Sequence, residues 1–473
     1  MEKKKIKPTF LQSISNIIFM VLVIGIGNGI LKIAVQPLLL LCAAYAAVMG
    51  LRLGYTWKDM EKGVAAKLEQ CMPTIFILMA VGIVVGTWVY AGTVPLLIYY
   101  GLQLISPQLF LVTAFIIVAI VSTATGTAWG STATAGVALM GIAIELKIPV
   151  GMAAGAIIAG GVFGDKLSPL SDTTNLAPLV CGIDLFDHIK HMLYTTVPAS
   201  IIGCTIWFFV GRGFDGNGTA ESIEALSSSL NSIYNFTPIM LIPILIIVIG
   251  AFTKKPTVPI MLLSSVVAIV IGVVINGFSY QDGLATVMGG FNISMAGPVS
   301  MDASVATESV LKLVERGGIM SMMTIVVTIF CGYAFAGIVE TIGCLDVMLE
   351  PFSKKIKKVW QLVGVTIIGS AILVFTAGVA SISILMVGTL LLPIYKKMGL
   401  KPNNLSRTLE DAGTMLIPFV PWGASGIFYH EILGVTVSQF WMWAIPCYLC
   451  SVIAMILAFT GIGISRIKAP EEV

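Results

Sequence analysis

Long apolar runs recur from one end of this chain to the other, and many are close to the roughly 20 residues that an α-helix needs to cross a bilayer. Hydrophobic residues make up 57% of the 473 residues and charged residues only 11%, well below the share of about 25% in soluble domains. We therefore predict an all-α membrane protein with about 11–12 transmembrane helices. The apolar runs predict the lipid bilayer as a partner. The formal net charge of +3 is small, so the sequence predicts no nucleic-acid partner.

Positive charges at the two ends of the chain predict its orientation. Lys3–Lys5 and Lys7 precede the first apolar run, which continues without a small-residue cleavage site and so predicts an uncleaved first helix. Arg466 and Lys468 follow the last apolar run. Because lysine and arginine collect on the cytoplasmic side of a membrane, we expect both termini in the cytoplasm.

One polar stretch, 163–175, interrupts the apolar pattern. It places Asp165, Lys166 and Asp172 between two apolar runs, with Pro169 as a helix breaker. A charge near the bilayer centre costs about 2.5–3.5 kcal/mol on insertion scales, so such groups mostly face a cavity and serve transport. Broken backbone at that depth must be buried in protein or line an aqueous site, and secondary transporters often bind ions or substrates at such breaks.

The oxygen atoms of this stretch predict a cation site. Na⁺ binds carboxylate, hydroxyl and carbonyl oxygens, whereas helix capping, the alternative, needs fewer of them. Lys166 is expected to neutralise a carboxylate or bind an anionic substrate, with snorkelling to the membrane interface as the alternative. The residues expected to bind Na⁺ and H⁺ in this stretch are Asp165, Asp172, Ser168, Ser171, Thr173, Thr174 and Asn175.

Two further polar segments are candidates for the same site, one near 127–131 and the other near 410–414. The first lies in a run of small residues, for which close helix packing is the plainer explanation, and the second lies at a second polar break. Arg407 precedes Asp411 by one helical turn and is placed to pair with it. The candidate ligands are Thr127 and Ser131 in the first segment, and Glu410, Asp411 and Thr414 in the second.

The positions of the breaks predict two related halves. In each half a small-residue break, near 125–132 and 376–381, is followed by an apolar run, a proline and a second polar break. Matching interruptions in two halves are the sequence sign of a repeat-built transporter with discontinuous helices. We predict an N-terminal half over 1–210, a polar connecting loop over 211–235 and a C-terminal half over 236–473.

The sequence lacks the motifs of the enzymes and pumps that it partly suggests. His430 and Glu431 begin like H-E-x-x-H, but Gly434 stands where the second histidine belongs, and no Walker A motif occurs. His188 and His191 have a spacing compatible with a metal but lack further ligands at fixed spacing, so a helix at the membrane interface is the favoured interpretation. We predict neither an enzyme nor a bound cofactor.

Residues 164–177, Gly-Asp-Lys-Leu-Ser-Pro-Leu-Ser-Asp-Thr-Thr-Asn-Leu-Ala, closely resemble the signature of the NhaC family of bacterial Na⁺/H⁺ antiporters. The likeness continues through 184–192, 122–130 and 91–95, and more diffusely through 409–414. A leucine stands at 167, where many members have methionine. The resemblance implies a single-chain antiporter of the bacterial inner membrane, of the ion-transporter type, in which Na⁺ moves against H⁺.

Some members of that family look like malate/lactate exchangers that move Na⁺ and protons with the organic acids, and this alternative stays open. An ion channel is a third hypothesis, which the paired breaks and the titratable site disfavour. On the antiporter hypothesis Asp165 and Asp172 bind Na⁺ and H⁺ in competition. On the exchanger hypothesis Lys166 and helix N-termini hold the organic anion, and a homodimer is compatible with either.

Overall fold

The computed structural model describes residues 5–31, 33–169, 171–214, 220–253, 255–301, 310–311, 314–345, 347–348 and 356–467. In this part of the chain all regular structure is helical, apart from one isolated bridge between Leu400 and Arg466. Eight of the described helices are long and apolar enough to cross a membrane, or up to ten if each of two bent helix pairs is one span, and two shorter apolar helices accompany them. The all-α membrane class with broken helices is confirmed, and the total of about 11–12 spans stays a prediction.

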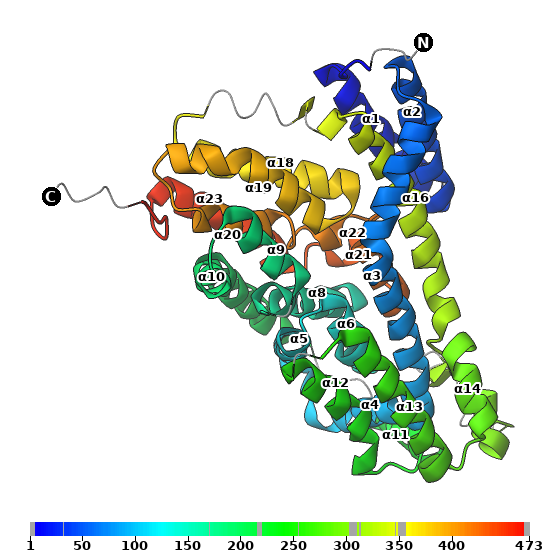
Figure 1. Ribbon diagram of the computed structural model, residues 1–473. Helices are drawn as coiled ribbons and strands as arrows, with labels where there is room; N and C mark the ends of the chain where they lie inside the picture. The colour runs from blue at the N-terminus through cyan, green and yellow to red at the C-terminus, as the bar shows by residue number, and fades with distance from the viewer. Residues whose placement is uncertain are drawn as a thin grey trace.

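Long helices form an upright group on one side of the molecule (Figure 1): α1 (Phe10–Ile24), α2 (Val35–Arg52), α3 (Trp57–Ala91) and α16 (Met323–Thr341). α3 begins at a capping box of Thr56 and Asp59. The backbone and hydroxyl of Thr56, together with Lys5, lower the pKa of Asp59 to about 2. Small residues let α3 approach α16 closely, because a Cβ on Gly63 would lie 1.8 Å from Thr341 Oγ1.

A second group of helices gathers at the far end of α3 (Figure 1): α4 (Thr93–Leu104), α11 (Ala220–Ile233), α12 (Ile242–Phe252), α13 (Thr257–Asn276) and α14 (Tyr280–Gly289). Gly92, with a φ of 85°, ends α3 and begins α4, and the two helices are bent by 69° relative to each other. Part of the segment 211–235, predicted as a polar connecting loop, is helical, since it contains α11. The division into two halves stays a prediction.

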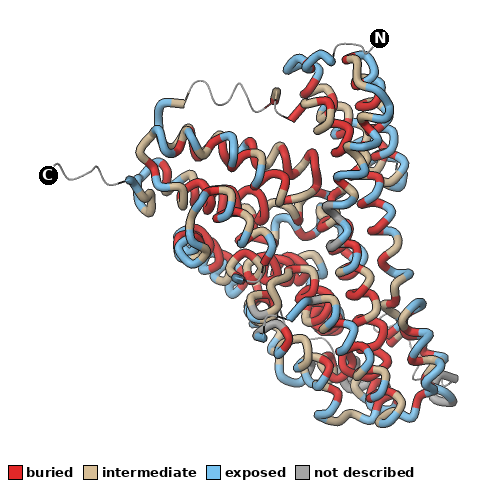
Figure 2. Tube along the Cα trace, viewed as in Figure 1, coloured by how far each residue is buried: buried red, intermediate tan, exposed pale blue. Residues whose placement is uncertain are grey.

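The remaining helices form a layered bundle that carries the polar breaks: α5 (Phe110–Thr125), α8 (Val150–Leu167), α10 (Leu185–Gly211), α18 (Val359–Ala377), α19 (Ala380–Lys397), α20 (Asn403–Ala412) and α23 (Ile445–Thr460). Figure 1 shows α18, α19, α20 and α23 above α5, α8 and α10, crosswise to α3. Buried segments fill the region where these layers meet (Figure 2). A Cβ on Gly164 would lie 2.4 Å from the Ala119 carbonyl, so α8 packs closely against α5 and carries its end into the interior.

Two pairs of helices in this bundle follow the same local path. α5 ends before Gly126, whose φ is 71°, and an extended Thr127 leads into α6 (Ala128–Ser131); the helix continues through a π-turn, 132–136, into α7 (Val137–Glu145). α18 ends before Gly378, whose φ is 70°, and an extended Val379 leads into α19. Glycine is needed at both corners because a positive φ is strained for other residues. This match supports the repeat that the sequence predicted.

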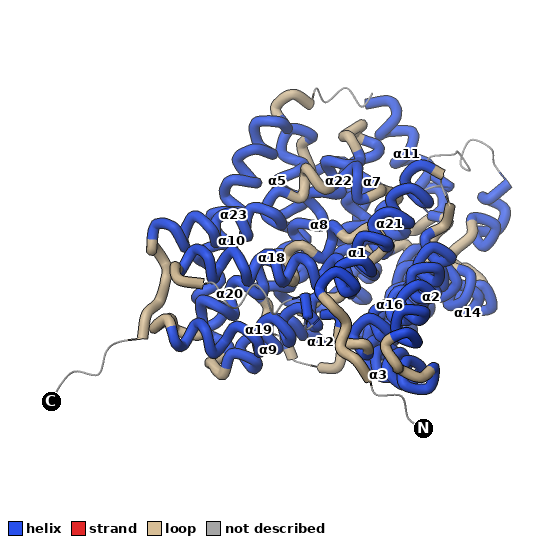
Figure 3. The backbone as a smooth tube through the Cα atoms, turned by 90° about the horizontal axis from the view of Figure 1, so that it is seen from above, coloured by secondary structure: helices blue, strands red, loops and turns tan. Residues whose placement is uncertain are grey.

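After each corner comes a polar break. In the first, α8 is followed by α9 (Asp172–Cys181), and in the second, α20 is followed by α21 (Ala424–Leu433). α9 packs against α19 and α20 of the second half, and α21 packs against the π-turn and α7 of the first. Figure 3 shows α9, α19 and α20 together, away from α2, α3 and α16. The two breaks are thus interleaved.

Candidate functional site

The helix that follows the first break, α9, supplies side chains that hydrogen-bond to the main chain of the break. α8 ends at Leu167, which leaves carbonyl groups of its last turn without helical partners. The Thr174 hydroxyl donates to the main-chain oxygens of Lys166, at 2.9 Å, and Asp165, at 3.2 Å. The Asn175 amide donates to the Pro169 carbonyl at 2.8 Å and the Ser171 carbonyl at 2.7 Å. Thr174 and Asn175 therefore hold the broken backbone in shape.

The two aspartates of the first break have different surroundings. Asp165 is half-buried and lies within hydrogen-bonding range of the Ser171 hydroxyl and the backbone of Ala128, at the start of α6. Asp172 is exposed in the first turn of α9. Ser168 is buried, and Ser171 and Thr173 share a hydrogen bond of 3.3 Å. Of the two predicted carboxylates, Asp165 is the one that neighbours Glu410 of the second break.

The second break is the more deeply buried one. Every residue of α20 from Asn404 to Ala412 is buried, because α9, α10, α18, α19 and α23 pack around it. The Glu410 and Asp411 side chains lie inside this ring and are both 0% exposed. The sequence predicted these two residues as candidates, and the structure places them beside the end of α8.

Asp411 is held by three different helices. Its Oδ1 forms an ion pair with Lys166 Nζ at the end of α8, and it also accepts a hydrogen bond of 2.8 Å from the Thr195 hydroxyl of α10. The Ser451 hydroxyl of α23 donates to the Asp411 main-chain oxygen at 2.8 Å. A buried carboxylate needs such partners, since an isolated buried charge is strongly unfavourable.

This ion pair settles two expectations about basic residues. Lys166 neutralises a carboxylate, as one of its predicted roles required, and its partner comes from the other half of the chain. Arg407 forms no ion pair with Asp411, a pairing that the sequence left open beside participation in the site, and its Nη1 donates to the Gly463 carbonyl at 3.0 Å. The cation beside Asp411 is therefore Lys166 of α8, and not Arg407 of the preceding helical turn.

Glu410 has an unusual environment for a buried carboxylate. Among the described residues its oxygens form no ion pair and no hydrogen bond of good geometry, and the Thr414 hydroxyl, one turn on, lies within hydrogen-bonding range of the carboxylate. Its charged neighbours are Lys166, Asp165 and Asp411. Burying an unpaired carboxylate is costly unless it carries a proton or binds a cation. Glu410 and Thr414 are therefore the clearest candidates for a position that an ion or proton fills.

Thr127 and Ser131 make local bonds at the corner between α5 and α6. The Thr127 hydroxyl accepts from the Gly130 N–H at 3.3 Å, and the Ser131 hydroxyl donates to the Thr127 and Ala128 carbonyls, both at 3.0 Å. The next aromatic residue crosses to the second half, since Trp129 Nε1 donates to the Ser425 hydroxyl at 3.2 Å. At this corner the Ala128 backbone lies near Asp165 of the first break, and Trp129 contacts Ser425, which follows the second break.

Comparison with known proteins identifies the family. The sequence profile described as the Na⁺/H⁺ antiporter family matches residues 160–462. The chain belongs to this family. An uncharacterized Na⁺/H⁺ antiporter of Haemophilus influenzae is 39% identical to this antiporter over 463 residues, which is 98% of each chain. The Na⁺/H⁺ antiporter NhaC of Alkalihalophilus pseudofirmus is 37% identical over 437 residues, 92% of each chain.

A third relative is named for a different cargo. The malate-2H⁺/Na⁺-lactate antiporter of Bacillus subtilis is 33% identical over 451 residues, 94% of this chain and 93% of its own. The predicted NhaC resemblance is confirmed by these matches. The protein is a multi-pass membrane transporter of the secondary type, and not an enzyme.

Several residues of the antiporter's polar centre were missed in the sequence. Thr195 and Ser451 look like ordinary hydroxyl residues within apolar helices, and only their contacts with Asp411 mark them. His188 and His191 were expected at the membrane interface, and the structure buries both on the face of α10 that meets α20. Positions 188, 191 and 195 have the spacing of one helical face. This polar face is the pattern from which the sequence could have predicted that α10 contributes to the centre.

The number of acidic and histidine ligands limits what the centre can hold. Within the described ranges, no group of three or more His, Cys, Asp or Glu side chains is arranged to hold a metal ion. A transported Na⁺ would need hydroxyl and main-chain oxygens in addition to carboxylates. The Thr414 hydroxyl near Glu410, the Ser171 hydroxyl near Asp165 and the backbone of the two breaks are sources of such oxygens.

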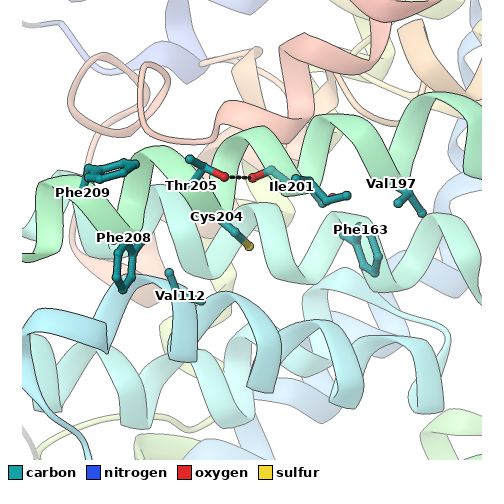
Figure 4. A pocket seen from close by; sticks show the side chains of 9 residues that line it. Val112, Phe163, Val197, Ile201, Cys204, Thr205, Phe208 and Phe209 are labelled. Atoms are coloured by element: carbon teal, nitrogen blue, oxygen red, sulfur yellow. Dashed lines mark hydrogen bonds between the residues drawn. The ribbon is translucent and has the colours of Figure 1, made fainter.

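One surface groove of the antiporter lies apart from this centre. It has a volume of about 600 Å³ and lies between α10, α5 and α8 (Figure 4). Apart from the hydroxyl side chains of Ser200 and Thr205 its lining is apolar, with no charged residue, which suits contact with lipid better than cation binding. The lining residues are Val112, Phe163, Val197, Ser200, Ile201, Cys204, Thr205, Phe208 and Phe209.

Proposed function

We propose that this protein exchanges Na⁺ for H⁺ across the inner membrane of a bacterium, with both termini in the cytoplasm. The observation that carries the proposal is Glu410, a fully buried carboxylate that forms no ion pair among the described residues and lies beside Lys166, Asp411 and the Thr414 hydroxyl. Asp165 reaches the same place from the other broken helix. Carboxylates from two breaks that meet in the interior suit a carrier that binds either a cation or a proton.

Charge balance explains why the two ions would compete. Lys166 and Asp411 neutralise each other, so Glu410 and Asp165 contribute the remaining negative charge. An empty site would leave these charges buried and unbalanced, which is costly. Binding of Na⁺ or of a proton restores the balance, and both cannot occupy the same carboxylate. Na⁺ arriving from one side would therefore expel a proton, and alternation of access would complete the exchange.

The other predicted residues would act around this centre. Ser171 and Thr414 are proposed to supply hydroxyl ligands next to Asp165 and Glu410. Asp172, being exposed, is proposed to attract cations toward the first break. The remaining predicted residues are proposed to support the shape of the first break and of the neighbouring corner: Ser168, Thr173, Thr174, Asn175, Thr127 and Ser131.

The test is Na⁺-driven proton flux in proteoliposomes that contain no organic acid. Glu410→Gln and Asp165→Asn keep the size and an oxygen of each side chain but cannot release a proton, and each should reduce the flux at least about tenfold, equivalent to about 1.4 kcal/mol. Asp187→Asn is the matched control, since Asp187 is exposed at the start of α10. Flux close to that of the unaltered protein in both variants would contradict the proposal.

A second candidate function is exchange of organic acids coupled to Na⁺ and H⁺. One observation favours it: the buried guanidinium of Arg407 has two nitrogen atoms, Nε and Nη2, without partners among the described residues. The B. subtilis relative also carries malate and lactate in its name. If organic acids are obligatory cargo, Na⁺-driven proton flux should require malate or lactate on at least one side. Strong flux without them would exclude obligatory organic-acid exchange.

A further inference from the structure

The guanidinium of Arg407 is buried with its carboxylate-binding edge unoccupied. The side chain is 0% exposed, and its one recorded hydrogen bond runs from Nη1 to the Gly463 carbonyl. Nε and Nη2 have no partner in the described part of the chain. These two nitrogens carry the parallel N–H groups along one side of the guanidinium plane, the arrangement that binds both oxygens of a carboxylate.

Two buried histidines of α10 lie near Arg407. His191 has Arg407 among its electrostatic neighbours and lies beside Asn404, and His188 has Lys166 and His191 among its own. Both histidines are buried, and in each the Nε2 atom lacks a partner among the described residues. His188 Nδ1 lies 2.9 Å from the Ser406 hydroxyl. Unsatisfied polar atoms therefore collect at one place between α10 and α20.

The charges at this place favour an anion. Among the described residues, Asp411 is the carboxylate that neighbours Arg407 electrostatically; its Oδ1 bonds to Lys166 and Thr195, and its Oδ2 has no hydrogen-bond partner. A cation would be repelled by the unpaired guanidinium, whereas an anion would satisfy both nitrogens and the buried charge together. Lys166, the predicted anion-binding residue, is occupied by Asp411, so Arg407 is the better-placed group.

We propose that the Nε–Nη2 edge of Arg407, with His188 and His191 beside it, binds the carboxylate group of a small organic anion. The inference rests on the second candidate function, organic-acid exchange, and gives it a binding residue. The C-terminal segment lies against the remaining nitrogen of the guanidinium, since the Gly463 carbonyl accepts from Arg407 Nη1 and Ser465 bonds to Asn404 and Lys401.

The test is titration calorimetry on the full-length protein in lipid nanodiscs, without Na⁺. Choline L-lactate and choline malate are the probes, and choline chloride tests for binding of any anion. Arg407→Gln should weaken carboxylate binding at least about thirtyfold, since truncating one partner of a buried charge pair costs about 2–5 kcal/mol. Arg407→Lys should weaken it about tenfold, because the charge remains and the two-pronged geometry is lost. Arg212→Gln, at an exposed arginine, should change nothing.

Three results would overturn the inference: no carboxylate binding by the unaltered protein, equal binding by Arg407→Gln with an unchanged melting temperature, or chloride binding as tight as carboxylate binding. If only water, or the Asp411 carboxylate, occupies the Nε–Nη2 edge of Arg407, the unaltered protein will bind neither lactate nor malate. If Arg407→Gln does not fold, Arg407→Lys decides. Na⁺-driven proton flux without organic acid is measured in parallel, so that intact flux with no carboxylate binding counts against this inference alone.

Discussion

The two polar breaks differ in how their polar groups are satisfied. In the first, Thr174 and Asn175 donate to main-chain oxygens at the end of α8 and within the break. The second, 413–423, is longer and follows a helix that is buried from Asn404 onward. It leaves Glu410 without an ion pair, and one oxygen of Asp411 without a hydrogen-bond partner, among the described residues. The first break, whose sequence is the more densely polar, thus has more of its polar groups in hydrogen bonds. The polar groups that remain free to bind an ion lie mainly at the second break.

The largest expected effect is on the pair that joins the two breaks. Lys166→Met leaves the Asp411 carboxylate buried without its cation, and breaking a buried pair costs about 3–5 kcal/mol. The melting temperature of the purified protein should fall steeply. Lys190→Met, at an exposed lysine of α10, is the control, and Lys166→Met combined with Asp411→Leu should recover much of the loss. An unchanged melting temperature in Lys166→Met would show that the breaks are not held together by this pair.

A smaller loss is expected at Thr195, which supports the second break. Thr195→Val removes the hydrogen bond to Asp411, and a bond to a charged group contributes about 1.5–3 kcal/mol. Thr205→Val is the matched control on the same helix, because Thr205 is exposed and donates only to the Ile201 carbonyl. If both variants melt at the same temperature, Thr195 does not hold Asp411.

The bonds that close the first break are neutral and should contribute less. Thr174→Val removes two donations to carbonyls at the end of α8, and we expect a loss of about 0.5–1.5 kcal/mol. Thermal unfolding of the variant measures it, with Thr389→Val as a control whose hydroxyl bonds only within its own exposed helical turn. A loss as large as that of Lys166→Met would reverse the comparison between the breaks.

The smallest effect is expected at Asp172. Asp172→Asn removes an exposed charge from the first turn of α9, where a carboxylate favours the helix by about 0.3–1 kcal/mol. Its melting temperature should stay near that of the unaltered protein, and its Na⁺-driven flux should fall less than that of Asp165→Asn. A greater flux loss in Asp172→Asn than in Asp165→Asn would move the ion site to the outer side of the first break.

The sequence predicted the breaks but not the contacts across them. Gly126, Gly378 and Pro169 mark the corners and the break by backbone chemistry that acts locally. Glu410 and Asp411 stood out because carboxylates are rare in apolar surroundings. The Lys166–Asp411 pair spans 245 positions, and no local pattern specifies such a contact. Exposure could not be predicted either, since sequence spacing does not show which side of a break faces outward, and so Asp165 and Asp172 were given equal weight.

The central claim is that Na⁺ and a proton compete at Glu410 and Asp165. The most direct measurement is proton release from the purified protein in weakly buffered solution, followed with a pH indicator, when NaCl is added. We predict that NaCl releases protons and choline chloride does not, and that the release is lost in Glu410→Gln, reduced in Asp165→Asn and retained in Asp187→Asn. Release of the same size in Glu410→Gln and Asp165→Asn as in the unaltered protein would contradict the account.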